Sequence, residues 1–175
     1  MKLGLLTAIL DTSSFEEVVE IASEMGFSSL EVACWPSGTA ERRYAGVSHI
    51  DCERVCEDDI YADNIKNLVD KKHLAISSLA FYPNTLDPNP EKRSSNIAHL
   101  KAVIKASKKL GVNMVSTFIG RDQHKTVEEN ISLFLEIWPE IIRFAEEHKV
   151  KIAIENCPML FTEDQWPGGQ NLMCT

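Results

Sequence analysis

A single carboxylate at the end of an apolar run is the residue of this sequence best placed to do chemistry. The run ends in Ala153-Ile154-Glu155, and alternation along a strand would put Ala153 and Glu155 on the same face. An ionised carboxylate in an apolar interior is normally protonated, paired with a base or bound to a cation. Of these, we expect a bound metal cation at Glu155. A salt bridge to a neighbouring Lys or Arg is the alternative.

Aromatic residues follow two other apolar runs and could form the walls of a substrate pocket. Trp35 ends the run Ala33-Cys34-Trp35, where its face could stack on the apolar side of a ligand ring, although a core aromatic under a helix fits equally well. Phe81, with Tyr82, could form a second wall or could pack within a loop. We expect Trp35 and Phe81 to bind substrate.

Polar residues beside these runs are candidates for binding and orientation. Arg121 has the planar fork that suits a phosphate or carboxylate, and a surface ion pair with a nearby acid is the alternative. Asn156 could orient Glu155 or cap a turn. We place both among the expected substrate-binding residues. His49 could reach the pocket, but its position in a long loop favours a solvated histidine.

The elements that would position these residues alternate between short apolar runs and helical patterns. Near-continuous apolarity is typical of parallel strands that are covered on both faces. The predicted strands are Leu3–Leu10, Leu30–Trp35, Leu74–Phe81, Met114–Ile119 and Lys151–Glu155. The predicted helices begin at Ser13-x-x-Glu16, lie within Asp51–His73, span Glu91–Leu110, and begin at Thr126-x-x-Glu129 with a kink at Pro139. We expect the first helix to bury Met25 and the last to bury Ile131 and Leu135.

Length and composition restrict the class of protein. The 175 residues, 44% of them hydrophobic, predict one α/β domain over 1–175, whereas a closed eight-stranded barrel typically needs about 250 residues. The net charge of -8 disfavours nucleic acid, and no run has the length of a membrane span. Five cysteines without a disulfide pattern favour a reducing compartment, so we expect a cytoplasmic protein.

Several of these segments resemble the sugar isomerase/epimerase superfamily, the xylose isomerase-like TIM barrels. The most specific match is the fifth-strand segment Ile152–Met159 with the following Trp166–Asn171. The segments Asn84–Arg93 and Phe118–Arg121 are similar to the same family. The resemblance covers the whole chain and implies a TIM-barrel-type fold, truncated to roughly five β/α units with helices on the outside.

The resemblance also implies a function in carbohydrate metabolism. In that family the residue matching Glu155 is an acidic ligand of a divalent metal (Mn, Mg, Co or Zn) and a candidate acid/base for proton transfer next to a sugar carbonyl, through an enediolate. The substrate would be a sugar or sugar phosphate. The later metal ligands of the family come from strands six to eight and have no counterpart here, so the activity of this chain alone is in question.

Two other functions remain open. An apurinic-site endonuclease of the same superfamily would need histidine zinc ligands after strands three and four, and neither Ser78–Phe81 nor Thr117–Gly120 supplies one. A non-catalytic half-barrel that associates with itself is the second alternative, because an open parallel sheet leaves unpaired edges and uncovered apolar side chains. We therefore expect a homo-oligomer.

Overall fold

The computed structural model describes residues 2–36, 46–157 and 171–174, and these form one five-stranded parallel sheet. The strands pair in sequence order, so every connection is a crossover to the next strand. They are β1 (Gly4–Leu6), β2 (Ser29–Ala33), β3 (Ala75–Ala80), β4 (Met114–Thr117) and β5 (Lys151–Ile154). This arrangement confirms the predicted TIM-barrel-type half fold.

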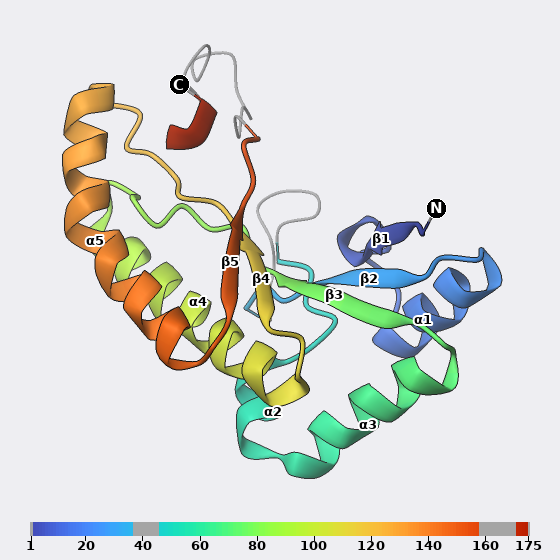
Figure 1. Cartoon of the computed structure of the whole chain (residues 1–175). Coiled ribbons are helices and arrows are strands. Elements are labelled where there is room, and N and C mark those ends of the chain that lie inside the picture. The colour runs from blue at the N-terminus through green and yellow to red at the C-terminus, as the bar shows by residue number, and fades with distance from the viewer. Residues whose placement is uncertain (1, 37–45, 158–170, 175) are drawn as a thin grey trace.

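Helices cover one face of this sheet, which we call the outer face (Figure 1). They are α1 (Phe15–Glu24), α2 (Cys52–Glu57), α3 (Asp59–Lys71), α4 (Pro90–Leu110) and α5 (Val127–Glu147). Strand residues such as Leu30, Val32, Leu79 and Val115 are fully buried among helix residues in the main core. Their alternating neighbours lie on the opposite, inner face. No helix in the described residues has the length and hydropathy to cross a membrane.

The N-terminal part differs from the prediction in several details. The strand expected over Leu3–Leu10 ends at Leu6, because Thr7–Ile9 turn into a 3₁₀-helix. The first capping box is Ser14 with Glu17, one residue later than predicted. Met25 is 69% exposed, because it is the C-terminal cap of α1 and lies beyond the buried stripe.

The region predicted as one helical stretch over Asp51–His73 is two helices. Asp58 has extended backbone angles and ends α2 while its carboxylate caps α3. The other ends match the prediction better. The chain ends α4 at Gly111 in the left-handed conformation, and α5 starts with the Thr126–Glu129 capping box and continues through Pro139.

The apolar stripe of α5 is only partly buried. Trp138, Ile141 and Ala145 pack in the core as predicted, whereas Ile131 and Leu135 are 45% and 63% exposed. The reason is geometric: β5 is the last strand of the described sheet, so no further β/α unit of the described chain packs beside the first turns of α5. The prediction that Ile131 and Leu135 are buried was therefore wrong.

The loops after β3 and β4 are fastened together by Asn84. Its Oδ1 accepts hydrogen bonds from the Arg121 and Leu86 N–H groups at 2.9 and 3.0 Å, and its Nδ2 donates to the Arg121 carbonyl at 2.8 Å. Gly120 lies against this side chain with φ +85°, and a Cβ built on it would stand 1.9 Å from Asn84 Oδ1. We call this contact the Asn84–Gly120 clasp; it requires a residue without a side chain at position 120.

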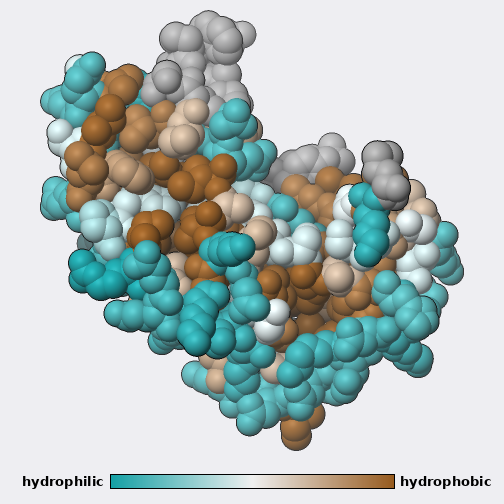
Figure 2. All heavy atoms as spheres, in the orientation of Figure 1, coloured by the Kyte–Doolittle hydropathy of each residue, from teal (hydrophilic) through white to brown (hydrophobic). Residues whose placement is uncertain are grey.

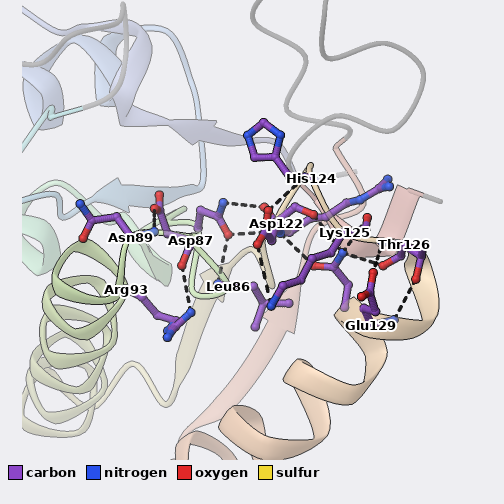
Figure 3. A network of polar contacts seen from close by, with 12 residues as sticks. Leu86, Asp87, Asn89, Arg93, Asp122, His124, Lys125, Thr126 and Glu129 are labelled. Carbon is purple, nitrogen blue, oxygen red and sulfur yellow. Dashed lines mark hydrogen bonds and ion pairs between the residues drawn. The ribbon is translucent and has the colours of Figure 1, made fainter.

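A wider polar network continues from the clasp to the N-termini of α4 and α5 (Figure 3). The Asp87 carboxylate accepts from the Asn89 N–H, and Asp122 Oδ1 accepts from the His124 N–H. The Asn130 side-chain oxygen accepts from the Asp122 N–H, and the Asn130 side-chain amide donates to the Asp122 carbonyl. The loops at this edge of the sheet are therefore held by their own side chains.

Replacing Gly120 by alanine should destabilise the protein more than the same change at Gly111. Both glycines have positive φ, but a Cβ at Gly111 meets nothing within 4 Å. We expect Gly111→Ala to lower the free energy of unfolding by about 1–2 kcal/mol through backbone strain alone. Gly120→Ala should cost roughly 1–3 kcal/mol more through the clash with Asn84. Urea denaturation of the two variants measures the difference, and equal losses would contradict the clasp.

Candidate functional site

The inner face carries a half-buried carboxylate that sequence analysis missed. Glu31 of β2 accepts hydrogen bonds from the Tyr82 hydroxyl at Oε1 and from the Ser78 hydroxyl at Oε2, the latter at 3.2 Å. The Ser116 hydroxyl lies 3.4 Å from the same oxygen and 3.0 Å from Ser78 Oγ. We call Glu31, Ser78, Ser116 and Tyr82 the inner polar stripe. It links β2, β3 and β4 across the sheet.

A register shift between β2 and β3 sets this geometry. Leu30 pairs with Ile76, but Glu31 pairs with Ser78, so the partner strand has one extra residue at Ser77. The Ser77 hydroxyl turns back to the Leu30 carbonyl at 3.0 Å. The irregularity places the buried Ser78 hydroxyl, which can donate, opposite the Glu31 carboxylate.

Glu155 follows β5 at the carboxyl end of the sheet. Its N–H donates to the Thr117 carbonyl at 3.0 Å, which extends the β4–β5 pairing by one residue. The side chain is exposed, so the expectation of a carboxylate enclosed in an apolar interior was wrong. The cause is again that β5 is an edge strand in the described chain, with no sixth strand to cover it. Its predicted roles as metal ligand and acid/base remain predictions.

The electrostatic surroundings of Glu155 still set it apart. Partial burial of its carboxyl, and then the negative charge of Glu31, raise the pKa of Glu155 above its ordinary value. Burial raises the pKa of Tyr82 too, followed by its bond to Glu31 and the charges of Glu31 and Glu155. The negative charges of Glu31 and Glu155 therefore both raise the pKa of Tyr82, at the edge of the inner polar stripe.

The backbone around Glu155 is held by a segment distant in sequence. The Asn171 side chain donates to the carbonyls of Glu155 and Cys157 at 3.0 and 2.7 Å, and the Leu172 N–H donates to the Gly120 carbonyl at 3.0 Å. Asn171 is fully buried. Asn156, predicted to orient Glu155, is exposed beside it, and its role stays a prediction.

The predicted aromatic residues divide between the two faces of the sheet. Trp35 is half-buried and lies against Tyr82, with ring centroids 5.7 Å apart. Phe81 is only 2% exposed and packs edge-on against His99 of α4, which is the placement of a core residue. Its neighbour Tyr82 lies on the inner face, where its ring also packs against Phe118, with ring centroids 4.6 Å apart. We therefore transfer the expected substrate contact from Phe81 to Tyr82.

Arg121 and His49 lie on different loops from the inner polar stripe. The main chain of Arg121 is bound on both sides to Asn84 in the clasp, and its role in binding substrate stays a prediction. His49 is buried, so the reading as a solvated histidine was wrong. Its Nδ1 lies 2.9 Å from the Thr7 hydroxyl and its Nε2 lies 3.3 Å from the Leu10 carbonyl. Burial lowers the pKa of His49 and favours its neutral form.

The described residues do not make a complete metal centre. Within residues 2–36, 46–157 and 171–174, no three Asp, Glu, His or Cys side chains converge on one point. Glu31 is already surrounded by three hydroxyl groups, which leaves Glu155 as the accessible carboxylate. Catalytic zinc sites use three protein ligands, and Glu155 alone does not provide them.

Comparison with known families places this site in context. A model of the xylose isomerase-like TIM barrel matches residues 19–169. The chain belongs to this family. A search of curated protein sequences finds no match.

Solved structures of the same fold include sugar epimerases. D-psicose 3-epimerase of Clostridium cellulolyticum, in complex with D-tagatose, is 18% identical with a TM-score of 0.65, over 93% of this chain and 55% of that one. The probable 3-DHS dehydratase AsbF of Bacillus anthracis is 16% identical with a TM-score of 0.65, over 90% and 53%. The IolI protein with a bound zinc atom is 20% identical with a TM-score of 0.62, over 88% and 51%. The chain thus spans about half the length of the solved structures it matches.

Removing the Tyr82 hydroxyl should destabilise the protein through the inner polar stripe. Tyr82→Phe leaves the half-buried Glu31 carboxylate without one of its donors, and we expect the free energy of unfolding to fall by about 1–3 kcal/mol. Tyr61→Phe is the matched control, because the Tyr61 hydroxyl only accepts one long bond, 3.3 Å, from the exposed Asp51 N–H. Urea denaturation compares the two, and a Tyr82→Phe variant as stable as the control would show that the stripe contributes little.

Proposed function

We propose that this chain serves a metal-dependent sugar or sugar phosphate isomerase or epimerase. The observation that carries the proposal is the accessible Glu155 carboxylate, at the carboxyl end of β5, under the influence of the Glu31 charge. Working residues of TIM barrels lie at this end of the strands. The family and the sugar epimerase among the solved structures support the same reaction class.

The chain's own residues suit a proton transfer next to a carbonyl. In the proposed reaction, the Glu155 carboxylate takes a proton from the carbon beside the sugar carbonyl, which leaves an enediolate and a protonated Glu155. Return of that proton to the neighbouring carbon, with the hydroxyl proton passing from one sugar oxygen to the other, gives an isomer. An epimer requires a second acid that delivers a proton to the opposite face while Glu155 keeps the proton it removed. A raised pKa makes the carboxylate a stronger base for the first step and keeps the proton for the second.

The proposed metal dependence needs ligands in addition to Glu155. Glu155 is offered as one ligand of a divalent cation (Mn, Mg, Co or Zn), and the other ligands would have to come from residues outside those described. The zinc atom in the IolI structure supports the idea for the fold, not for this chain. When bound, such a cation would stabilise negative charge on sugar oxygens.

Hydrogen exchange into a ketose tests the proposed chemistry. We expect the protein, given Mn²⁺ and D-fructose or D-tagatose in D₂O, to introduce deuterium at the carbon beside the carbonyl, as read by proton NMR. Glu155→Gln should slow the exchange by about 100-fold or more, because it removes the base. Glu136→Gln, an exposed glutamate on α5, is the matched control and should leave the rate unchanged.

Other outcomes would contradict the proposal. No exchange with any ketose, or exchange that Glu155→Gln leaves unchanged, would contradict the role of Glu155 as the base. Exchange that is insensitive to EDTA would contradict metal dependence. Cleavage of abasic DNA by the same preparation would favour the endonuclease alternative, which the net charge of -8 disfavours.

We also propose that the chain associates with itself through the exposed apolar surface at the start of α5. A cavity of about 350 Å³ lies between α5 and the C-terminal segment, lined by Ile119, Val127, Ile131, Phe134, Leu135, Leu172 and Met173. Hydrophobic atoms gather over this part of the molecule in Figure 2. Exposed apolar groups of this kind favour association over a solvated surface.

Sedimentation velocity tests the self-association. We expect the unmodified protein to sediment as a dimer or larger species at micromolar concentration, and Leu135→Glu to shift it toward the monomer, because a charge at the apolar cavity must be desolvated on association. Leu135 is 63% exposed, so its replacement leaves the core intact. Ile60→Glu, another exposed apolar position at 74%, on α3, is the control. A monomer in every sample would contradict the proposal.

A further inference from the structure

The end of β2 is held by a short segment that pairs with it in the antiparallel direction. The His49 N–H donates to the Ala33 carbonyl at 2.9 Å, and the Trp35 N–H donates to the Val47 carbonyl at 3.1 Å. The main chain of Trp35, an expected substrate contact, therefore depends on where residues 47–49 lie.

The side chain of His49 fixes this segment to the end of β1, the neighbour of β2 in the sheet (Figure 1). In the buried ring, Nδ1 lies 2.9 Å from the Thr7 hydroxyl and Nε2 lies 3.3 Å from the Leu10 carbonyl. The Thr7 hydroxyl oxygen also accepts a hydrogen bond from the Ala33 N–H at 2.9 Å. Thr7 and His49 thus hold both polar main-chain groups of Ala33, the N–H and the carbonyl.

The partners of the two ring nitrogens define where the hydrogens of this pair must be. A carbonyl can only accept, so Nε2 of His49 carries a hydrogen toward Leu10. In the neutral ring Nδ1 is then an acceptor, and the Thr7 hydroxyl donates to it. The hydroxyl accepts one bond from Ala33 and donates one to His49, so the neutral ring leaves no hydrogen of the pair without a partner.

A protonated ring does not fit the same arrangement. The Nδ1–H would face the Thr7 hydroxyl, whose own hydrogen would have to turn away and lose its acceptor. Burial opposes the charge as well: it lowers the pKa of His49, and the carbonyls of Leu10 and Ser13 offset only part of that change. Protonation therefore costs a hydrogen bond together with the desolvation of a cation.

The charged and titratable groups that face His49 lie around a cavity of about 510 Å³. Glu16 at the start of α1, Arg54 of α2 and Tyr61 of α3 line this cavity together with His49. Arg54 lies over the Tyr61 ring at 4.3 Å, and burial raises the pKa of Tyr61, so its hydroxyl stays neutral. On the segment of His49 itself, the Asp51 carboxylate accepts from the Arg54 N–H and caps α2. Because Glu16 and Arg54 are exposed, the cavity gives solvent protons access to the ring.

We propose that His49 is a positioning residue for Trp35, and that protonation of its ring releases the end of β2. With the neutral ring, Thr7 and His49 hold Ala33, and residues 47–49 hold Trp35. With the charged ring, the bond from Thr7 is lost and residues 47–49 lose their side-chain contact with the end of β1. The role of Trp35 as a substrate contact rests on the proposed function, whereas the pH-dependent hold on its main chain does not.

NMR spectroscopy of the full chain tests the release. In ¹H–¹⁵N spectra recorded from about pH 7.5 to about pH 5, the indole N–H of Trp35 is identified by its loss in Trp35→Phe. We expect this signal and the Ala33 amide signal to shift with one midpoint, equal to that of the His49 ring protons. That midpoint should lie below 6.5, the ordinary pKa of histidine, because burial disfavours the cation.

Variants at three positions separate His49 from other causes of the shift. His49→Asn keeps an acceptor near the Nδ1 position but does not titrate, so the pH-dependent shift should disappear. Thr7→Val removes the hydroxyl donor and should raise the His49 midpoint toward 6.5, and Thr7→Ser should restore it. His99→Gln is the matched control and should leave the shift in place, because Nε2 of His99 donates to the Cys34 carbonyl, a bond that a charged ring also makes.

Urea denaturation gives a second readout of the same protonation. The unfolded chain binds a proton at His49 more readily than the folded one. The free energy of unfolding of the unmodified protein should therefore fall relative to His49→Asn as the pH drops below 6.5, and the two should run parallel above it.

The outcomes distinguish this inference from the proposed reaction. A Trp35 signal that stays fixed or follows another group, a shift that persists in His49→Asn, or a shift that is lost in His99→Gln would overturn the role of His49. Absence of deuterium exchange with every ketose would overturn the isomerase proposal and leave this inference standing.

Discussion

The carboxylate of Glu31 constrains the rest of the inner face. A charged group partly buried on a strand requires hydrogen-bond donors, and here they come from β3 and β4 through Ser78, Tyr82 and Ser116. The irregularity at Ser77 meets this requirement, because it places the Ser78 hydroxyl opposite the acid. The stripe thereby fixes the relative position of three strands and supplies the charge that Glu155 experiences.

The sequence predicted the architecture well because burial on both faces leaves a clear apolar signal. The cores of β2, β3 and β4 were located by uninterrupted apolar runs, and the start of α5 by the Thr126–Glu129 box. Residues near the termini were harder. The run from Leu3 looks like one strand, yet Thr7 begins a 3₁₀-helix, and its hydroxyl oxygen accepts a hydrogen bond from the Ala33 N–H at 2.9 Å. Such a bond joins residues 26 positions apart, and apolarity does not encode it.

The candidate site was harder to predict than the fold. Glu31 stands alone between Leu30 and Val32, and a single acid in an apolar strand could have been recognised by the argument applied to Glu155. The donors that surround it depend on strand register, which one sequence does not give. Glu155 was located correctly at the end of a strand, but its exposure depends on what covers the neighbouring edge. Phe81 and Tyr82 were adjacent candidates, and the face of the strand decided between them.

The Asn84–Gly120 clasp joins two loops that sequence alone would treat as separate. Asn84 belongs to the loop after β3 and Gly120 to the loop after β4, and Thr85 adds a second connection through its hydroxyl bond to the Ile119 carbonyl at 2.5 Å. The Trp138 indole donates to that same hydroxyl at 3.0 Å, which brings α5 into the connection. Evolutionary change at this rim is therefore coupled: a relative that lengthens one of these loops must adjust the other, so insertions in the two should occur together across the family.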